Sequence, residues 1–217
     1  PSSLCVSASI QKPYYQKKSD KYYRPMLQQL LQRLPNDTAH HKADAAVLMA
    51  MTKEDIPRLI LTQRAAHLKS HAGEVAFPGG KRDDTDSSLI YTALREAQEE
   101  IALNPQDVEV VGELGIFTSR VGLKVKPIIG LLDDIPHLKP SPDEIDSIFT
   151  VPLDVFLTQK PNYQHKIKYM GISIPVPSFN YQGYVIWGLT GFMIVEFMRR
   201  VYDADIDWRW PNPLKRD

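Results

Sequence analysis

Residues 79–86 read GGKRDDTD, and residues 94–100 read LREAQEE. In a helix the glutamates of the second stretch fall on one side: Glu96 and Glu100 lie about 40° apart around the axis, and Glu99 lies about 60° from Glu96. The apolar residues of the same segment gather on the opposite side, namely Ile90, Leu94, Ala97 and Ile101. The pattern predicts a helix with one core-facing side and one densely acidic side, entered from a glycine turn.

The acidic side of this helix calls for a counter-charge. Like charges three and four residues apart repel each other, so the pattern destabilises the helix unless a cation lies among the glutamates. Hard divalent ions such as Mg²⁺ and Mn²⁺ prefer oxygen ligands of this kind. The pattern therefore indicates a site for Mg²⁺ or Mn²⁺. For an E-x-x-E-E pattern alone, a solvated acidic surface is the alternative interpretation.

These residues resemble the Nudix box, whose usual form is G-x5-E-x7-R-E-U-x-E-E-x-G-U, with U an aliphatic residue. The residues that align are Arg95, Glu96, Ala97, Glu99, Glu100 and Leu103. Gly80 and Arg95 are separated by one residue more than usual, so the early acidic position is Asp86 or Ser87. Ala102 replaces the final glycine, which argues against a left-handed helix end because alanine, unlike glycine, is strained at positive φ.

The segment upstream of the box resembles the additional signature of the coenzyme A pyrophosphatase branch of this family. That signature runs approximately L-L-T-x-R-x3-L-x-x-H-x-G-x-V-A-F-P-G-G, and here residues 61–64 read LTQR and residues 68–81 read LKSHAGEVAFPGGK. Weaker downstream signatures of the branch resemble residues 140–145, 151–153 and 186–190. Together the resemblance covers about residues 45 to 200.

The resemblance implies an α/β fold, a Nudix-type α/β/α sandwich with a mixed β-sheet. It also implies metal-dependent hydrolysis of the pyrophosphate bond of coenzyme A or its derivatives to adenosine 3′,5′-bisphosphate and 4′-phosphopantetheine. One alternative is a broader Nudix pyrophosphatase acting on dinucleotides, nucleotide sugars or ADP-ribose. A remoter alternative is a non-catalytic nucleotide-sensing module, and the retained glutamates of the box argue against it.

The resemblance also carries roles for individual residues. Glu96 and Glu100 are the leading metal ligands, Glu99 is a further ligand or catalytic group, and the carbonyl of Gly80 completes the shell. Arg95 stands four residues before Glu99, so its expected role is to orient that glutamate, with an ordinary surface ion pair as the alternative.

The general base is a separate prediction, because Nudix enzymes differ in where this residue lies. Glu144 is the candidate for base or additional metal ligand, and Asp143 is the second choice. Glu74 is a further candidate because it lies close to the glycines in sequence. A solvated loop carboxylate is the alternative for each.

A site for coenzyme A needs local cations for its phosphates. Basic residues surround the glycines in sequence, and we expect at least two of them to contact substrate phosphate: Arg64, Lys69, His71, Lys81 and Arg82. For each residue alone, a solvated side chain is the alternative.

Composition limits the partners. Lysine plus arginine equals aspartate plus glutamate, 26 against 26, so no global charge attracts nucleic acid or membrane. No apolar run approaches the length of a membrane span. The single cysteine, Cys5, suits a reducing compartment, and we expect a cytoplasmic location. The oligomeric state stays open, a homodimer included.

The chain is long enough for one sizeable core, so we expect a single domain over residues 23–217. Residues 1–22 are polar and rich in tyrosine without clear periodicity, and we expect them to form an N-terminal arm. Periodicity and composition predict strands at residues 45–51, 58–62, 74–77, 108–117, 124–131 and 147–151. They also predict helices at residues 26–34, 152–156 and 187–201, a hairpin region at residues 165–186 and a long loop at residues 133–143.

Overall fold

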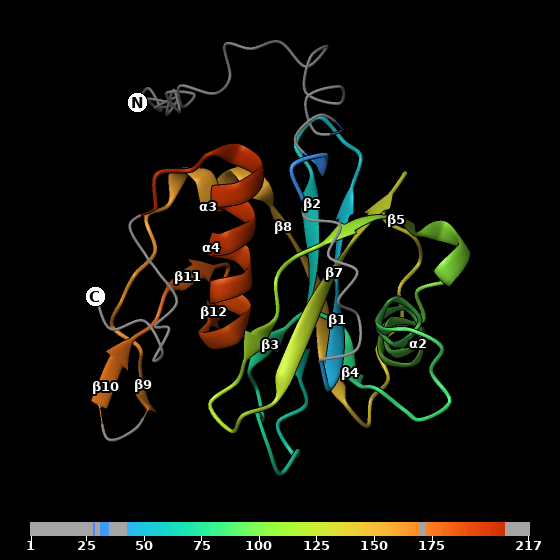
Figure 1. The fold of residues 1–217 in the computed structure, drawn as a ribbon, viewed down its shortest axis with the longest axis horizontal. Helices are drawn as coiled ribbons and strands as arrows, with labels where there is room; N and C mark the ends of the chain where they lie inside the picture. Colours follow the sequence, from blue (N-terminus) through green and yellow to red (C-terminus); the bar gives the residue numbers. More distant parts are fainter. Residues whose placement is uncertain (1–27, 29–30, 35–42, 170–171, 207–217) are drawn as a thin grey trace, which may run out of the picture.

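A computed structural model describes residues 28, 31–34, 43–169 and 172–206 (Figure 1). The predicted arm at residues 1–22 and most of the predicted helix at residues 26–34 lie outside the described residues. Within the described residues, no helix is both long enough and apolar enough to span a membrane.

A mixed β-sheet forms the centre of the fold. Its strands are β1 (Ala45–Thr52), β2 (Arg58–Arg64), β3 (Val75–Ala76), β4 (Gly79–Lys81), β5 (Glu109–Glu113), β6 (Phe117–Thr118), β7 (Lys124–Leu132) and β8 (Ile145–Pro152). The main order is β3-β2-β1-β7-β5, while β4 pairs with β1, β6 with β7 and β8 with β2. Strands β1 and β7 run parallel and the other pairs are antiparallel.

Helices cover both faces of this sheet. Helix α2 (Leu89–Ile101) lies on one face, while α3 (Leu153–Thr158) and α4 (Gly188–Tyr202) lie on the other (Figure 1). The short 3₁₀ turn η3 (Pro105–Asp107) follows α2. The predicted α/β fold with a mixed sheet between helical layers is therefore confirmed.

Strand β1 shows why the sheet is central. Ala46 and Leu48 pack in the core under α2, and Ala45, Met49 and Met51 pack in the core under α4. Side chains alternate between the faces of a strand, so an almost continuous apolar run is what a strand buried on both faces requires.

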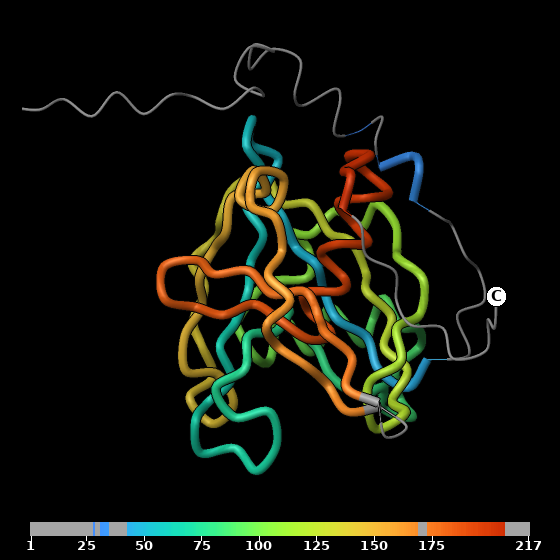
Figure 2. The backbone as a smooth tube through the Cα atoms, turned by 90° about the vertical axis from the view of Figure 1, so that its left-hand side faces the viewer, coloured from blue at the N-terminus to red at the C-terminus, as the bar shows by residue number. Residues whose placement is uncertain are grey.

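Two hairpins lie between α3 and α4, in the region where a hairpin was predicted, residues 165–186. They are β9 (Lys166–Tyr169) with β10 (Ile172–Pro175), and β11 (Ser178–Tyr181) with β12 (Tyr184–Trp187). Figure 2 shows the second hairpin and the loop between β2 and β3 projecting from the body of the domain. The predicted loop at residues 133–143 contains neither helix nor strand.

Two predicted elements differ from the structure. The expected glycine turn is instead strand β4, antiparallel to β1, with Ala46 opposite Gly80. The strands approach so closely that a Cβ on Gly79 would lie 2.4 Å from the carbonyl oxygen of Ala46, so only glycine fits there. The single strand expected at residues 108–117 is split into β5 and β6, with a register shift between Val110 and Gly112.

The end of α2 corrects another expectation. Ala102 adopts the left-handed conformation with φ 56° and ψ 28°, although glycine is absent. Its N–H donates to the carbonyl of Gln98, and the N–H of Leu103 donates to the carbonyl of Ala97, at 3.0 and 3.4 Å. Leu103 is buried, so these two bonds and an apolar anchor hold the strained alanine in place.

The substitution Ala102→Gly should therefore raise the free energy of unfolding by about 0.5–1 kcal/mol, because glycine relieves the strain of a positive φ. Urea unfolding followed by circular dichroism measures the change. The matched control is Gln98→Gly, an exposed position within the same helix, which should lose about 1 kcal/mol. A loss of stability in Ala102→Gly would contradict the assignment.

Candidate active site

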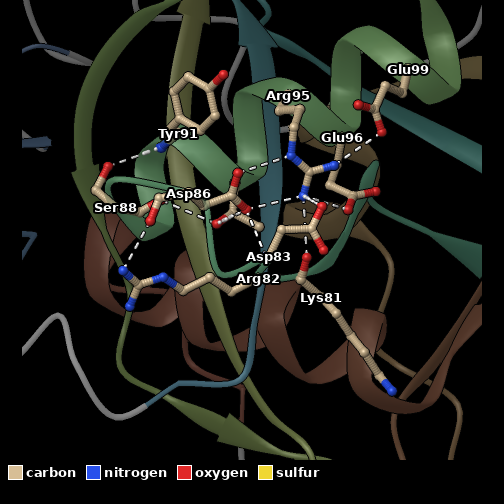
Figure 3. Close-up of polar contacts among 10 residues, drawn as sticks. Lys81, Arg82, Asp83, Asp86, Ser88, Tyr91, Arg95, Glu96 and Glu99 are labelled. Atoms are coloured by element: carbon tan, nitrogen blue, oxygen red, sulfur yellow. Dashed lines mark hydrogen bonds and ion pairs between the residues drawn. The ribbon is translucent and has the colours of Figure 1, made fainter.

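Arg95 of α2 lies at the centre of a charged network (Figure 3). Its Nε and Nη2 donate to the two carboxylate oxygens of Asp86, each at 3.0 Å. Asp86 also accepts from the N–H of Asp83 and the hydroxyl of Thr92. The Asp86 side chain is fully buried, and hydrogen bonding from Arg95 lowers its pKa to about 2. A bidentate contact with so many donors keeps Asp86 ionised and fixes the direction of the guanidinium.

The other side of the Arg95 guanidinium faces the glutamates. Nη1 donates to Glu99 Oε2 at 3.0 Å, and Nη2 donates to Glu96 Oε1 at 2.9 Å and to the carbonyl of Lys81 at 3.3 Å. The Arg95–Glu99 contact expected from their spacing is present. The contacts with Asp86 and Glu96 were not expected, because helical spacing alone predicts only a contact between Arg95 and the residue four positions later, Glu99.

Glu96 lies directly against the backbone of β4. A Cβ added to Gly80 would lie 2.5 Å from the Glu96 carboxylate, so the glycine makes room for the glutamate. Burial raises the pKa of Glu96 while Arg95 opposes that rise, and the charges of Glu99 and Glu144 add to it. Carboxylates that raise one another's pKa in this way form an anionic cluster that favours a cation.

Only 4% of Glu100 is exposed, which argues against the alternative interpretation of a solvated acidic surface at this position. It accepts a hydrogen bond from the N–H of Gly79 at 3.1 Å, and Nη1 of Arg64 lies 3.7 Å from its Oε1. Burial raises the pKa of Glu100 to about 7, with Glu144 and Glu96 contributing in the same direction. The acidic side of α2 is thus covered at one end by β4 and β2, and it is open only around Glu99.

Glu144 reaches this cluster through backbone contacts made by its loop. The N–H of Ser141 donates to the carbonyl of Glu100, and the N–H of Ala65 donates to the carbonyl of Glu144, both at 2.8 Å. Glu144 is exposed, and its charge raises the pKa of both Glu96 and Glu100. The structure therefore brings this candidate base beside the glutamates of α2.

The two other candidate bases are placed differently. The carbonyl of Asp143 contacts the Nε2 of His67 at 3.1 Å, and its side chain is exposed. The carboxylate of Glu74 contacts the Nδ1 of His71 at 2.8 Å within the loop that follows β2. Of the three, Glu144 is the one whose charge is among the main causes that raise the pKa of Glu96 and Glu100.

The five residues predicted to bind phosphate have different surroundings in the structure. Arg64 lies beside Glu100, whereas Arg82 donates to the carbonyl of Asp86 and so stabilises the loop before α2. His71 pairs with Glu74, as described above. The side chains of Lys69 and Lys81 are exposed, and Figure 3 shows that of Lys81 pointing away from the Arg95 network.

The donor set suits a hard divalent ion, although the described residues do not already converge on one. Among them, no three His, Cys, Asp or Glu side chains are grouped closely enough to hold an ion in the conformation seen. Arg95 supplies the positive charge beside Glu96 and Glu99 in this arrangement. The fit rests on the carboxylate cluster itself and on Gly80, whose missing side chain lets the Glu96 carboxylate lie against the backbone of β4.

Comparison with known proteins decides the family. The NUDIX domain model matches residues 39–170. The chain belongs to the Nudix hydrolase family. It is 40% identical over 173 residues to an uncharacterized Nudix hydrolase NudL of Citrobacter koseri, covering 80% of this chain and 90% of that protein. It is 41% identical over 175 residues to the NudL of Shigella boydii, with the same coverage.

Among solved structures, a MutT/nudix family protein from Enterococcus faecalis is similar at a TM-score of 0.48. It is 15% identical, and the match covers 85% of this chain and 73% of that chain.

The geometry locates the early acidic position of the Nudix box, which the sequence left open between Asp86 and Ser87. Asp86 is buried and binds Arg95, whereas Ser87 is exposed. Five residues separate Gly80 from Asp86, which is the usual number, so the additional residue of this box lies between Asp86 and Arg95, where eight residues replace the usual seven. The next residue, Ser88, caps the helix by accepting from the N–H of Tyr91 at 3.1 Å.

The substitution Asp86→Asn should destabilise the protein by about 2 kcal/mol at pH 7, because Arg95 loses its charged partner. The native pKa of Asp86 is depressed from 3.8 to about 2, so its contribution is present above about pH 4 and is lost as the pH falls towards 2. Denaturant unfolding at pH 7 and pH 3 should show a smaller difference between the two proteins at pH 3. Asp84→Asn, in the exposed part of the same loop, is the control and should leave stability unchanged. A difference that is independent of pH would contradict this role.

Proposed function

We propose that this Nudix hydrolase cleaves the pyrophosphate bond of coenzyme A or its derivatives, with Mg²⁺ or Mn²⁺ as cofactor. The products would be adenosine 3′,5′-bisphosphate and 4′-phosphopantetheine. We also propose a cytoplasmic location, because coenzyme A, which carries a thiol, and the single cysteine of this chain both suit a reducing compartment.

One observation carries the choice of substrate. The segment that resembles the coenzyme A signature directly borders the carboxylates of the Nudix box. Arg64 at its start lies beside Glu100, Gly79 near its end donates to the same carboxylate, and Gly80 gives room to Glu96. A segment that borders the reacting group in this way is well placed to select the molecule that carries the group.

The metal would be held by residues of α2 and β4. Glu96 and Glu100 are the leading ligands, and Glu99 and the carbonyl of Gly80 complete the set. When bound, the ion neutralises the charge of the pyrophosphate and lowers the pKa of the attacking water.

The remaining residues of the cluster position these groups and handle the proton. Arg95 is a positioning residue, because Asp86 fixes its direction while it holds Glu96 and Glu99. Glu144 is the proposed base. It is exposed beside the ligands, where a carboxylate can accept a proton from water.

The exposed cations are proposed to bind the outer parts of the substrate. Lys69 lies on the projecting loop after β2 and Lys81 ends β4, and both side chains are exposed, so a substrate can reach them from the solvent. His71 and Arg82 are also proposed to contact phosphate. Each of them would do so while keeping its contact with Glu74 or with the backbone of Asp86.

The variant Glu100→Gln should fold normally and lose turnover by at least about a hundredfold, because it removes a metal ligand but keeps the acceptor for Gly79. The kcat for coenzyme A at saturating Mg²⁺ measures the effect, with circular dichroism to verify the fold. Glu54→Gln, on the exposed turn between β1 and β2, is the control for loss of one carboxylate. Near-normal turnover of Glu100→Gln would rule out the ligand role.

A substrate panel tests the proposed specificity. The kcat/KM for coenzyme A should exceed those for ADP-ribose, nucleotide sugars and dinucleotide polyphosphates by at least about tenfold. Products are identified by mass after reaction in ¹⁸O-water, which also shows the phosphorus that is attacked. A higher kcat/KM for ADP-ribose or for a dinucleotide would replace the proposal with a broader pyrophosphatase.

A further inference from the structure

The backbone of Arg64 is fixed independently of its side chain. Its N–H donates to the carbonyl of Glu74 at 3.0 Å, and its carbonyl accepts from the N–H of Gly73 at 3.1 Å. These two bonds close the loop between β2 and β3. The loop therefore needs the main chain at this position but makes no use of a guanidinium.

The guanidinium itself is incompletely satisfied. It lies on the α2 side of the sheet with Nη1 3.7 Å from Glu100, which is beyond hydrogen-bond distance. Its Nε is buried and has no hydrogen-bond partner among the described residues. A buried N–H without an acceptor is unfavourable, so its presence calls for a functional explanation.

Two other arginines show what a satisfied guanidinium looks like in this fold. Arg58, at the opposite end of β2, donates through Nε and Nη2 to the hydroxyl of Thr150 at 2.9 and 2.6 Å. Arg95 uses the same two nitrogens to bind both oxygens of Asp86. At Arg64 the corresponding Nε has no acceptor among the residues that the structure describes, although the side chain is three-quarters buried.

We propose that the Nε side of Arg64 binds a non-bridging oxygen of the pyrophosphate that is cleaved, and not the 3′-phosphate of coenzyme A. The proposal rests on the function proposed above. A guanidinium presents two parallel donors that match phosphate oxygens. Glu100, a proposed metal ligand, lies beside Arg64, so the anion closest to both is the one that the metal holds. The 3′-phosphate is separated from that group by the ribose, and it falls to exposed cations such as Lys69 and Lys81.

A purely supporting role for Arg64 makes the opposite prediction for metal binding. If Arg64 only held Glu100 in place, its removal would weaken the binding of the metal. If Arg64 binds the pyrophosphate, its removal takes a positive charge away from the ion site. Affinity for the metal alone then stays the same or increases, while affinity for a diphosphate falls.

Calorimetry with α,β-methylene-ADP at saturating Mg²⁺ measures diphosphate binding without hydrolysis and without a 3′-phosphate. Arg64→Ala should weaken the affinity for the analogue on the order of tenfold to a hundredfold. The affinity of Arg64→Lys should lie between those of Arg64→Ala and the unmodified protein. Arg58→Ala, on the same strand, is the matched control and should bind normally. Mn²⁺ titration by electron paramagnetic resonance should show unchanged or tighter metal binding in Arg64→Ala. Should that variant not fold, Arg64→Lys provides both measurements.

Kinetics completes the test. The kcat/KM of Arg64→Ala should fall by the same factor for coenzyme A and for 3′-dephospho-coenzyme A. Four results would each overturn the assignment: a larger fall for coenzyme A, unchanged analogue binding by Arg64→Ala, no analogue binding by the unmodified protein, or weakened Mn²⁺ binding by Arg64→Ala. If neither coenzyme is hydrolysed by the unmodified protein but analogue binding depends on Arg64, the proposed substrate is wrong and the assignment of Arg64 stands.

Discussion

The bidentate contact between Arg95 and the buried Asp86 is the constraint on which the site depends. Asp86 stays ionised because Arg95, Thr92 and the backbone of Asp83 all donate to it. Because Asp86 binds two of its nitrogens, the guanidinium of Arg95 has a fixed position. Glu96 and Glu99 are therefore ordered against a fixed partner, and their negative charge is concentrated at the edge of β4.

The close approach of β4 to α2 provides the second part of the site. Gly79 and Gly80 allow the backbone to lie against a neighbouring strand on one side and against a carboxylate on the other. The N–H of Gly79 donates to the buried Glu100, and Gly80 leaves room for the Glu96 carboxylate. Any side chain at either glycine would displace one of these groups, so the helix and the strand form one functional unit.

Much of the fold could be predicted because its signals are local. Apolar runs indicated β1, β2 and β7, the helical period indicated α2, and a long, largely apolar segment indicated α4. Strand β4 was missed because glycines read as a turn, and only pairing with β1 makes them a strand. The left-handed Ala102 was not expected because its strain is offset by bonds and burial that the sequence does not display.

For the candidate site, the sequence suggested residues but not the contacts between them. Helical geometry gave the common direction of the glutamates, yet it could not show that β2 and β4 bury Glu100. The Arg95–Asp86 contact joins residues nine positions apart through a folded loop, so spacing alone did not identify it. Glu144 was chosen from its loop, and the backbone contacts of that loop with α2 and with Ala65 explain how it comes near the cluster.

The central claim is that these carboxylates bind a divalent ion, and direct titration with Mn²⁺ tests it. Electron paramagnetic resonance at neutral pH should show at least one ion bound per chain by the unmodified protein. The double variant Glu96→Gln/Glu100→Gln should bind none at the same concentrations while keeping its circular dichroism spectrum. Equal binding by both proteins, or none by the unmodified protein with or without nucleotide, would contradict the account.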